Sequence, residues 1–361
     1  MTHLSSVTNS IPTYTASACL DTQLSRKIVV LLAAYNGAQL VRDQIESIQQ
    51  QTISDWTLLV RDDCSEDHTR DVLKKFADED KRIRYVDDMR GHLGAAGNFG
   101  ELMRIALEEG ADTIFFSDQD DVWSSGKMAR QLHCLDDLER EYGPGIPLLS
   151  YSDLEVVDEN LDQIHPSFMH YQRQRHEHGD PIHVLLTQNF VAGCSVAINR
   201  PLLELAVPVP KEIMLHDWWL AVCTAACGRI GYIDQSLVRY RQHAKNHLGA
   251  LRIPLVGNFL APSYRKRLAK SQSHMHGTVA QALILKERIA LRNINCSANV
   301  RELLDRFSSC FGQSRAQRLW TVYRLPLRRQ GILRKLLLFL RLLLVPPKHL
   351  KQNVPKKAMA A

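Results

Sequence analysis

Hydrophobic runs and amphipathic segments alternate along the first third of the chain. Four runs are each long enough for one strand and end in polar residues; they cover residues 27–34, 56–60, 83–86 and 113–116. The segments between them carry apolar side chains at helical spacing, at residues 38–50, 69–76 and 98–109. Continuous apolar runs are typical of strands buried on both faces. The alternation therefore predicts an α/β domain with a doubly wound, mostly parallel sheet.

Polar residues follow three of the four predicted strands. Tyr35-Asn36 comes after the first strand, Asp62-Asp63 after the second, and the segment 118–121 after the fourth. In open α/β sheets, ligands bind beyond the carboxyl ends of the strands. We therefore expect these clusters to meet at one edge of the sheet.

The pattern continues with mixed elements and then becomes wholly helical. Helices are predicted at 127–142 and 215–226, strands at 148–157, 188–198 and 230–240, and an irregular loop at 165–181. From about residue 262 onward only helical patterns remain. We expect three regions, namely a flexible segment over 1–25, a catalytic α/β domain over 26–255 and a helical, basic extension over 256–361.

Composition adds a strong charge asymmetry. The chain has 361 residues, 45% of them hydrophobic and 23% charged, which is ordinary for a globular protein. Its eight cysteines form no C-x-x-C pair, so we expect thiols in a reducing compartment rather than a zinc site. Thirteen of the 45 Lys and Arg residues follow Asp305 and no acidic residue does, which leaves 32 basic against 39 acidic residues before that point. The tail therefore suits an anionic partner.

The most apolar part of this tail, Leu333–Val345, contains three basic residues and is too short to span a bilayer. A basic, Leu-rich helix is typical of a membrane interface with anionic headgroups. The alternative is a helix packed on the catalytic domain. Nucleic acid is not expected because no nucleic-acid-binding module accompanies the charge. With no visible signal peptide, we expect a cytoplasmic protein, peripheral on the inner face of the bacterial plasma membrane.

Three carboxylates are crowded into the segment that follows the fourth strand. Asp118, Asp120 and Asp121 repel one another unless one is protonated or a cation is bound. A hard divalent cation, Mn²⁺ or Mg²⁺, would relieve this repulsion and would neutralise charge on a diphosphate leaving group. The alternative is a solvated acidic turn that caps the helix starting near Ser124.

Seven motifs in sequence resemble those of family 2 glycosyltransferases. They are A-A-Y-N-G at 33–37, S-I-Q-Q-Q-T at 47–52, D-D-C-S-E-D-H-T at 62–69, D-Q-D at 118–120, N-F-V-A-G-C-S at 189–195, H-D-W-W at 216–219 and Y-R-Q-H-A-K-N at 240–246. Together they are similar to the bacterial rhamnosyltransferase-like branch of that family. The resemblance implies a GT-A nucleotide-sugar-binding fold over residues 26–255 and an inverting mechanism.

The resemblance also assigns the donor side of the site. Asp63 would accept a hydrogen bond from the imide N–H of a uracil or thymine base, a donor that cytosine lacks. Tyr35 would pack beside the base or ribose. Asp118 would face the ribose and the metal, with Asp120 as the main metal ligand. The neighbouring Asp62 is expected to cap the turn that follows it.

Four further residues are candidates for contact with the diphosphate or the metal. Gly97 and Asn98, predicted to open a helix, would approach the phosphates through backbone N–H groups. His243 would reach the metal or the diphosphate, and Arg241 is the alternative phosphate contact.

On the acceptor side, the resemblance places the catalytic base at Asp217. This carboxylate would take the proton from the acceptor hydroxyl, and Trp218 and Trp219 would stack on sugar rings. His216 stands where the family more often has Glu and is grouped with the acceptor contacts. The alternative is that Asp217 merely caps the helix beginning at Trp218.

These assignments predict transfer of a sugar, with inversion, from a nucleotide diphosphate donor to a lipid-linked cell-surface glycan of the O-antigen, lipopolysaccharide or capsule type. The rhamnosyltransferase-like motifs favour L-rhamnose from dTDP-rhamnose. A UDP-hexose donor is the first alternative. A nucleotidyltransferase and a non-catalytic nucleotide-sugar-binding membrane protein are the others.

Overall fold

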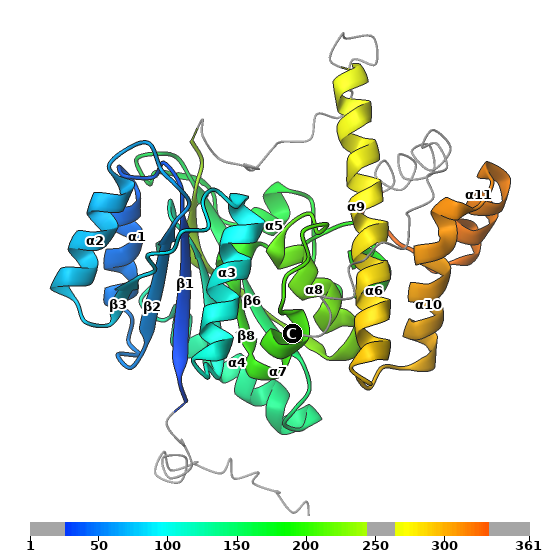
Figure 1. The fold of residues 1–361 in the computed structure, drawn as a ribbon, viewed down its shortest axis with the longest axis horizontal. Coiled ribbons are helices and arrows are strands. Elements are labelled where there is room, and N and C mark those ends of the chain that lie inside the picture. The colour runs from blue at the N-terminus through cyan, green and yellow to red at the C-terminus, as the bar shows by residue number, and fades with distance from the viewer. Residues whose placement is uncertain (1–25, 244–263, 332–361) are drawn as a thin grey trace, which may run out of the picture.

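A computed structural model describes residues 26–243 and 264–331. These residues form one mixed sheet covered by helices on both faces, with a group of C-terminal helices beside it (Figure 1). The predicted α/β class, the mostly parallel start of the sheet and the helical C-terminal extension are thus confirmed.

The first half of the sheet is parallel. It contains β1 (Ile28–Ala34), α1 (Val41–Gln49), β2 (Thr57–Asp62), α2 (Thr69–Glu79), β3 (Ile83–Tyr85), α3 (Gly94–Glu108) and β4 (Thr113–Asp118). The strands lie in the order β3-β2-β1-β4. In register, Ala33 pairs with Asp118 and Ala34 pairs with Asp62. The carboxyl ends of β1, β2 and β4 therefore lie together, as the sequence predicted.

The second half of the sheet is mixed and continues as β8-β6-β9-β5. Its elements are β5 (Val122–Trp123), α4 (Lys127–Tyr142), β6 (Leu148–Val157), β7 (Gln163–His165), α5 (Phe168–Tyr171), α6 (Ile182–Leu185), η1 (Gly193–Ser195), β8 (Val196–Asn199), α7 (Arg200–Ala206), α8 (His216–Cys227) and β9 (Arg229–Arg241). Strand β8 runs antiparallel to both of its neighbours, whereas β6 and β9 are parallel.

The sequence prediction was wrong for two segments here. Only the last part of the strand predicted over 188–198 is extended in the sheet, because the Asn189 side chain bonds to the backbone of Val191 through both its oxygen and its nitrogen. This local bonding replaces a strand ladder with a turn. The loop predicted over 165–181 contains the short helix α5, which Ser167 caps by accepting a hydrogen bond from the His170 N–H.

Alternating residues of β1 face two different cores, which explains its continuous apolar run. Val30 and Leu32 pack with α1, α2 and α4, and Val29 and Leu31 pack with α3, α7 and α8. Figure 1 shows α1 and α2 to one side of the sheet and α3 in front of it. Both faces are therefore covered, as expected for a doubly wound sheet.

The C-terminal helices α9 (Tyr264–Leu291), α10 (Ala298–Ser309) and α11 (Arg315–Arg324) share a core with α8. The buried Arg288 of α9 donates to the carbonyl oxygens of Leu205, Ala206 and Pro208, at 2.7–2.9 Å. No helix among the described residues is long and apolar enough to cross a membrane. The segment 1–25, the predicted boundary at 255/256 and the predicted helix Leu333–Val345 lie outside the described residues.

Candidate active site

The loops that follow β1 and β2 hold each other through side-chain hydrogen bonds. Asn36 accepts from the Glu66 N–H at 2.8 Å, and its own N–H donates to Ser65 Oγ at 2.8 Å. Asp62 accepts from both the backbone and the hydroxyl of Ser65. The prediction that Asp62 caps this turn is confirmed. Much of the motif D-D-C-S-E-D-H-T at 62–69 thus holds these two loops together rather than contacting a ligand.

The loop after β4 is joined to the same edge. The Gln119 amide accepts from the Tyr35 N–H at 2.8 Å and donates to the Tyr35 carbonyl at 2.9 Å. A Cβ atom on Gly37 would lie 2.2 Å from Gln119 Oε1, so this contact requires glycine. The middle residue of D-Q-D therefore fixes the position of the two carboxylates beside it.

Helix α1 supports the other side of the carboxylate loop. Ser47 Oγ accepts from the Trp123 N–H at 3.0 Å. Gln51 donates to the Ser124 carbonyl at 2.8 Å and accepts from the Met128 N–H at 3.1 Å. These contacts give the S-I-x-x-Q-T motif a physical role, because they clamp the chain that leaves the acidic cluster.

Asp118 and Asp121 converge with a thiol at the end of β4. One ligand atom each from Asp118, Asp121 and Cys194 lies within 4.8 Å of the others. Burial, with the nearby Asp120 and Asp217, raises the pKa of Asp118 to about 8, and burial also raises the pKa of Asp121. Such a cluster favours protonation or a cation.

Only Oδ1 of the Asp121 carboxylate accepts a hydrogen bond at the usual distance. Its Oδ1 accepts from the Arg241 N–H at 3.1 Å. Its buried Oδ2 has no hydrogen-bond partner at the usual distance, although the Cys194 thiol lies beside it. An uncompensated buried carboxylate oxygen fits a missing cation.

Asp120 contacts His243, whose Nε2 is 2.8 Å from Asp120 Oδ2. Adjacent ligands on one octahedral Mg²⁺ lie about 3 Å apart, given metal–oxygen distances of about 2.1 Å. The Asp120–His243 spacing is compatible with two ligands of one cation.

Asp217 lies in the first turn of α8 and is buried. Its Oδ1 accepts from the Trp218 N–H at 2.5 Å, and it also bonds to the Gly193 N–H and the Asn189 side chain. Burial, its largest influence, raises the pKa of Asp217 to about 7. Leu215, rather than Asp217, occupies the N-cap position of α8, so the simple capping alternative does not describe it. Asp217 also raises the pKa of Asp118, which places the two carboxylates in one site.

The N-F-V-A-G-C-S motif connects the two ends of the site. Asn189 and Gly193 contact Asp217, whereas Cys194 contacts Asp121. A Cβ atom on Gly193 would lie 3.1 Å from His216 Nε2 and 3.4 Å from Asp217 Cβ. The motif thus sets the distance between the proposed base and the acidic cluster.

In this structure the Asp63 carboxylate bonds to protein N–H groups rather than facing a site for a nucleobase. Its side chain is almost wholly buried, with Oδ1 accepting from Arg61 Nη1 and the Leu93 N–H and Oδ2 from the Gly94 N–H. His92 Nδ1 lies 3.1 Å from Oδ2 as well. In this conformation N–H donors of Arg61 and of residues 93–94 occupy both oxygens, so imide recognition by Asp63 stays a prediction that would require these donors to move. Tyr35 remains at the surface, 44% exposed.

Asn98 does not open a helix either. Helix α3 begins at Gly94, so Asn98 lies inside it, is buried and accepts from Arg61 Nη1 at 3.1 Å. The earlier start follows from Gly91 and Gly94, whose φ angles of 71° allow the preceding turn. The phosphate contact predicted for Gly97 and Asn98 is not supported.

The aromatic residues of α8 are core residues. Trp218 and Trp219 are 2% and 0% exposed, and their indole N–H groups donate to the Leu185 and Ala206 carbonyls. His216 stacks on Phe99 with 3.9 Å between ring centroids, and burial lowers its pKa to about 3. The predicted sugar contacts of these three residues are wrong, because α8 is packed on all sides.

Arg241 is also engaged elsewhere. Its Nη2 donates to Asp43 Oδ2 at 2.8 Å and its Nη1 to the Glu159 carbonyl at 3.4 Å. Its backbone N–H orients Asp121, whereas a phosphate contact of its side chain stays a prediction.

The sequence reasoning missed Lys127, which is fully buried beneath the acidic cluster. Its Nζ donates to Gln131 Oε1 at 2.7 Å and lies 3.7 Å from the centroid of the Trp123 ring. Burial lowers its pKa to about 7. It also missed Cys194, although the position of this residue inside N-F-V-A-G-C-S was a signal. Nothing in the sequence distinguished Lys127 from a surface lysine.

Solved structures support the fold. A structure of Staphylococcus aureus TarS residues 1–349 in complex with UDP-GlcNAc aligns with a TM-score of 0.51 at 14% identity, covering 78% of this chain and 70% of that one. At this identity the likeness concerns the fold, which is the GT-A fold that the sequence resemblance implied.

Sequence comparisons relate the chain to known glycosyltransferases. The chain is 26% identical over 228 residues to dTDP-rhamnosyl transferase RfbG of Shigella flexneri, covering 61% of this chain and 74% of the relative. It is 31% identical over 105 residues to UDP-Glc:alpha-D-GlcNAc-diphosphoundecaprenol beta-1,3-glucosyltransferase WfgD of Escherichia coli, covering 29% of this chain and 39% of the relative. Residues 29–190 match the model of Glycosyl transferase family 2. The family match over residues 29–190 and the relatives thus agree with the sequence motifs in indicating a nucleotide-sugar glycosyltransferase related to glycosyl transferase family 2.

Proposed function

We propose that the chain transfers a sugar with inversion and that Asp217 is the catalytic base. The acceptor hydroxyl oxygen attacks the anomeric carbon, the bond to the nucleotide diphosphate breaks, and Asp217 takes the hydroxyl proton. The observation that carries this assignment is the buried Asp217 carboxylate, with a pKa of about 7, in one site with Asp118. A base whose pKa lies near the working pH is ionised in a large fraction of the molecules and still accepts a proton readily.

We further propose that Asp118, Asp120 and His243 bind a divalent cation, Mn²⁺ or Mg²⁺. The Asp120–His243 contact and the raised pKa of Asp118 support this ligand set. The bound ion would stabilise negative charge on the leaving diphosphate. Asp121 and Cys194 lie close enough to orient the ligands or to join them.

The donor proposed is dTDP-rhamnose, with a UDP-hexose as the second candidate. The relative RfbG is named for dTDP-rhamnosyl transfer, whereas WfgD is named for UDP-glucose. We expect Tyr35, exposed at the end of β1, to pack beside the base or ribose.

A donor screen tests these assignments. Purified protein is heated with dTDP-rhamnose, UDP-glucose, UDP-galactose or GDP-mannose, each with Mn²⁺, Mg²⁺ or excess EDTA, and the melting temperature is recorded. We expect one donor to raise it by several degrees and EDTA to abolish the shift. If no diphosphate sugar stabilises the protein with either metal, the proposed reaction is wrong.

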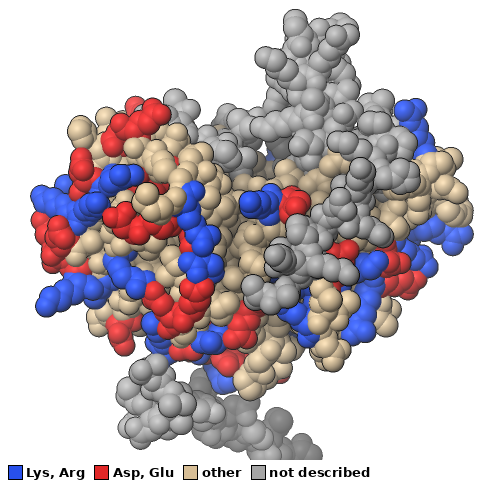
Figure 2. All heavy atoms as spheres, viewed as in Figure 1, with Lys and Arg blue, Asp and Glu red and all other residues tan. Residues whose placement is uncertain are grey.

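For the acceptor we propose a saccharide linked to a lipid carrier in the membrane and used in cell-surface polysaccharide synthesis. The name of the relative WfgD includes a diphosphoundecaprenol carrier. In this chain, α11 exposes Trp320 and Tyr323, at 58% and 71%, beside Arg324. Figure 2 shows Lys and Arg side chains along this edge, over α10 and α11. Exposed aromatic and basic side chains suit a membrane interface, so we propose that the C-terminal region holds the enzyme on the inner face of the plasma membrane.

A further inference from the structure

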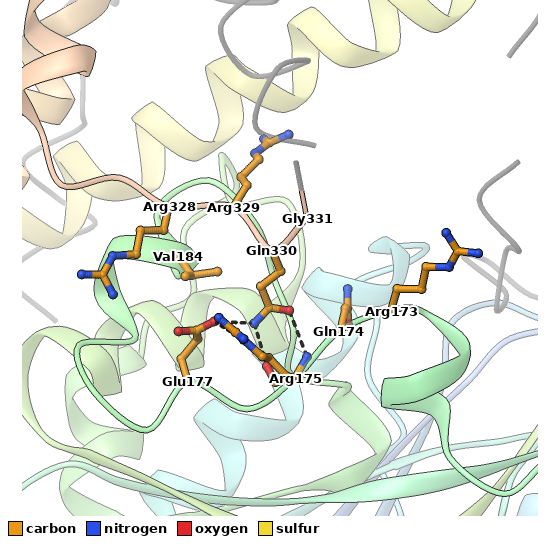
Figure 3. Close-up of a pocket in the computed structure, with 9 residues that line it drawn as sticks. All are labelled: Arg173, Gln174, Arg175, Glu177, Val184, Arg328, Arg329, Gln330 and Gly331. Carbon is orange, nitrogen blue, oxygen red and sulfur yellow. Dashed lines mark hydrogen bonds and ion pairs between the residues drawn. The ribbon is translucent and has the colours of Figure 1, made fainter. Parts of the chain in front are cut away.

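Two segments far apart in the chain enclose a cavity of about 470 Å³ outside the carboxylate cluster. One segment follows α5 and contributes Arg173 and Arg175; the other follows α11 and contributes Arg328 and Arg329 (Figure 3). Glu177 is the one acidic residue among those that line the cavity. Four guanidinium groups against one carboxylate give this cavity a strong positive charge.

Gln330 holds the two segments together. It is buried, accepts from the Arg175 N–H at 3.0 Å and donates to the Arg175 carbonyl at 2.6 Å and to Glu177 Oε1 at 2.9 Å. Its own N–H donates to Gln188 Oε1 at 3.1 Å. The backbone that carries the arginines is therefore fixed, while the Arg173, Arg328 and Arg329 side chains fan out around Gln330 (Figure 3).

Among the residues that line the cavity, Glu177 is the one carboxylate that can neutralise the arginines. Arg175 Nε lies 3.5 Å from Glu177 Oε1, a long contact made by a side chain that is mostly exposed. Arg328 is exposed, and its backbone rather than its side chain bonds to His183, at 2.9 Å. Exposed arginines on fixed backbone can turn toward a multivalent anion without rearranging the fold.

The cavity also adjoins the proposed base. Gln174, which lines it, donates to the Asn189 carbonyl at 3.4 Å, and the Asn189 side chain bonds to Asp217. Arg329 donates to the carbonyl of Thr187, in the same segment, at 2.6 Å. The arginines therefore lie beside the segment that positions Asp217.

We propose that this arginine cavity binds the diphosphate of the acceptor's lipid carrier, which places the first sugars of the glycan beside Asp217. The proposal rests on the proposed function for the identity of the acceptor. Arginine binds phosphate oxygens through two parallel N–H donors, so several guanidinium groups match a diphosphate better than a neutral glycan. The short path to Asp217 implies that the acceptor saccharide is short.

The test compares the wild type with Arg175→Gln/Arg328→Gln. Three acceptors carry one saccharide on a short polyprenyl diphosphate, on the corresponding monophosphate or on a neutral alkyl chain. We expect the wild type to prefer the diphosphate by at least about tenfold in kcat/KM. The double variant should lose this preference through KM, with the donor KM and the rate on the neutral acceptor unchanged. Arg140→Gln, an exposed arginine of α4 outside the cavity, is the matched control.

A binding measurement separates this site from the proposed reaction. Farnesyl diphosphate, farnesol and phosphatidylglycerol vesicles are titrated against wild type and double variant. Arginine-dependent binding of farnesyl diphosphate supports the site even if no transfer is detected, a result that would contradict the proposed function alone. Equal affinity of both proteins for farnesyl diphosphate overturns the site. So does arginine-dependent binding to vesicles without binding of farnesyl diphosphate, because the arginines would then recognise a phospholipid surface.

Discussion

Two carboxylates, the half-buried Asp118 and the buried Asp217, are held in one site although desolvation disfavours their charged forms. Burial is the largest cause of the raised pKa of each, and no described arginine or lysine side chain is hydrogen-bonded to either. Buried charges of this kind weaken the folded state and are common at functional sites. The two predictions at this scale concern Asp217.

The substitution Asp217→Asn tests the base. We expect kcat to fall by about 10²–10⁴-fold, because the amide cannot accept a proton, while the metal-dependent shift in melting temperature caused by the donor is retained. The control is Asp137→Asn, which removes an exposed carboxylate of α4. Near-normal transfer by Asp217→Asn would exclude Asp217 as the base.

The pH dependence follows from the raised pKa of Asp217, about 7. Since the base must be ionised, kcat/KM should rise about tenfold per pH unit below pH 7 and level off above it. The free energy of unfolding should instead fall as the pH rises. The unfolded carboxyl ionises near pH 4 and the folded one near pH 7, so the unfolded state binds fewer protons between these values and stability falls as the pH rises.

Denaturation of wild type and Asp217→Asn at pH 4, 6 and 8 measures this effect. At pH 8 we expect the variant to be more stable by on the order of 2 kcal/mol. The difference should shrink toward pH 4, where the folded carboxyl is neutral and the unfolded one is only about half ionised. A difference that does not depend on pH would contradict the assigned titration.

At the scale of elements, the site depends on how closely η1 approaches the start of α8. Gly193 donates its N–H to Asp217. It also lies so close to His216 that a larger residue at position 193 would require His216 or the backbone to move. A single methyl group at this contact would therefore change the geometry of the base.

The substitution Gly193→Ala tests this packing. The new Cβ would meet His216 Nε2 at 3.1 Å, and His216 cannot yield easily because its buried ring stacks on Phe99 and also contacts Phe116. We expect kcat to fall by about tenfold or more, with a stability loss of about 1–3 kcal/mol. Gly179→Ala is the control, because no atom lies within 4 Å of its added Cβ. Unchanged kcat in Gly193→Ala would show that the turn can move without disturbing Asp217.

At the scale of the whole molecule, the C-terminal helices are part of the catalytic body. Residues of α9 and α10, such as Val279, Leu285 and Phe307, share one core with α3 and α8. The hydrogen bonds of Arg288 to three carbonyl oxygens at the end of α7 and just beyond it strengthen this contact. Unfolding of the helices should therefore be coupled to unfolding of the active-site domain.

The substitution Arg288→Met tests this coupling. It removes the donors to three carbonyls and leaves them in an apolar contact, so we expect a loss of about 2–4 kcal/mol in one cooperative transition. Chemical denaturation followed by tryptophan fluorescence and by circular dichroism measures it. Arg301→Met, on the exposed face of α10, should change stability little. Two separate transitions in the wild type would contradict a shared core.

Much of the fold was predictable because its first half depends on local patterns. Continuous apolar runs in β1, β2 and β4 reflect burial on both faces, and the polar residues after them lie at one edge because parallel strands end together. The predicted bounds of α4 and β6 agree with the structure because each is a regular element with a clear period. The acidic cluster and the position of Asp217 followed from motifs in the sequence.

The orientation of individual side chains was decided only in three dimensions. Asp63 and Arg241 have the chemistry for base and phosphate contacts, but neighbours far away in the chain, the segment 92–94 and Asp43, already occupy them. Trp218 and Trp219 are suited to stacking on sugars, but both faces of α8 are enclosed. The arginine cavity joins segments more than 150 residues apart through Gln330. The sequence by itself thus determined which chemical groups are present and where the strands end, since both follow from composition and periodicity. Only the tertiary structure decided which of these groups remain available to a ligand, because their availability depends on long-range packing.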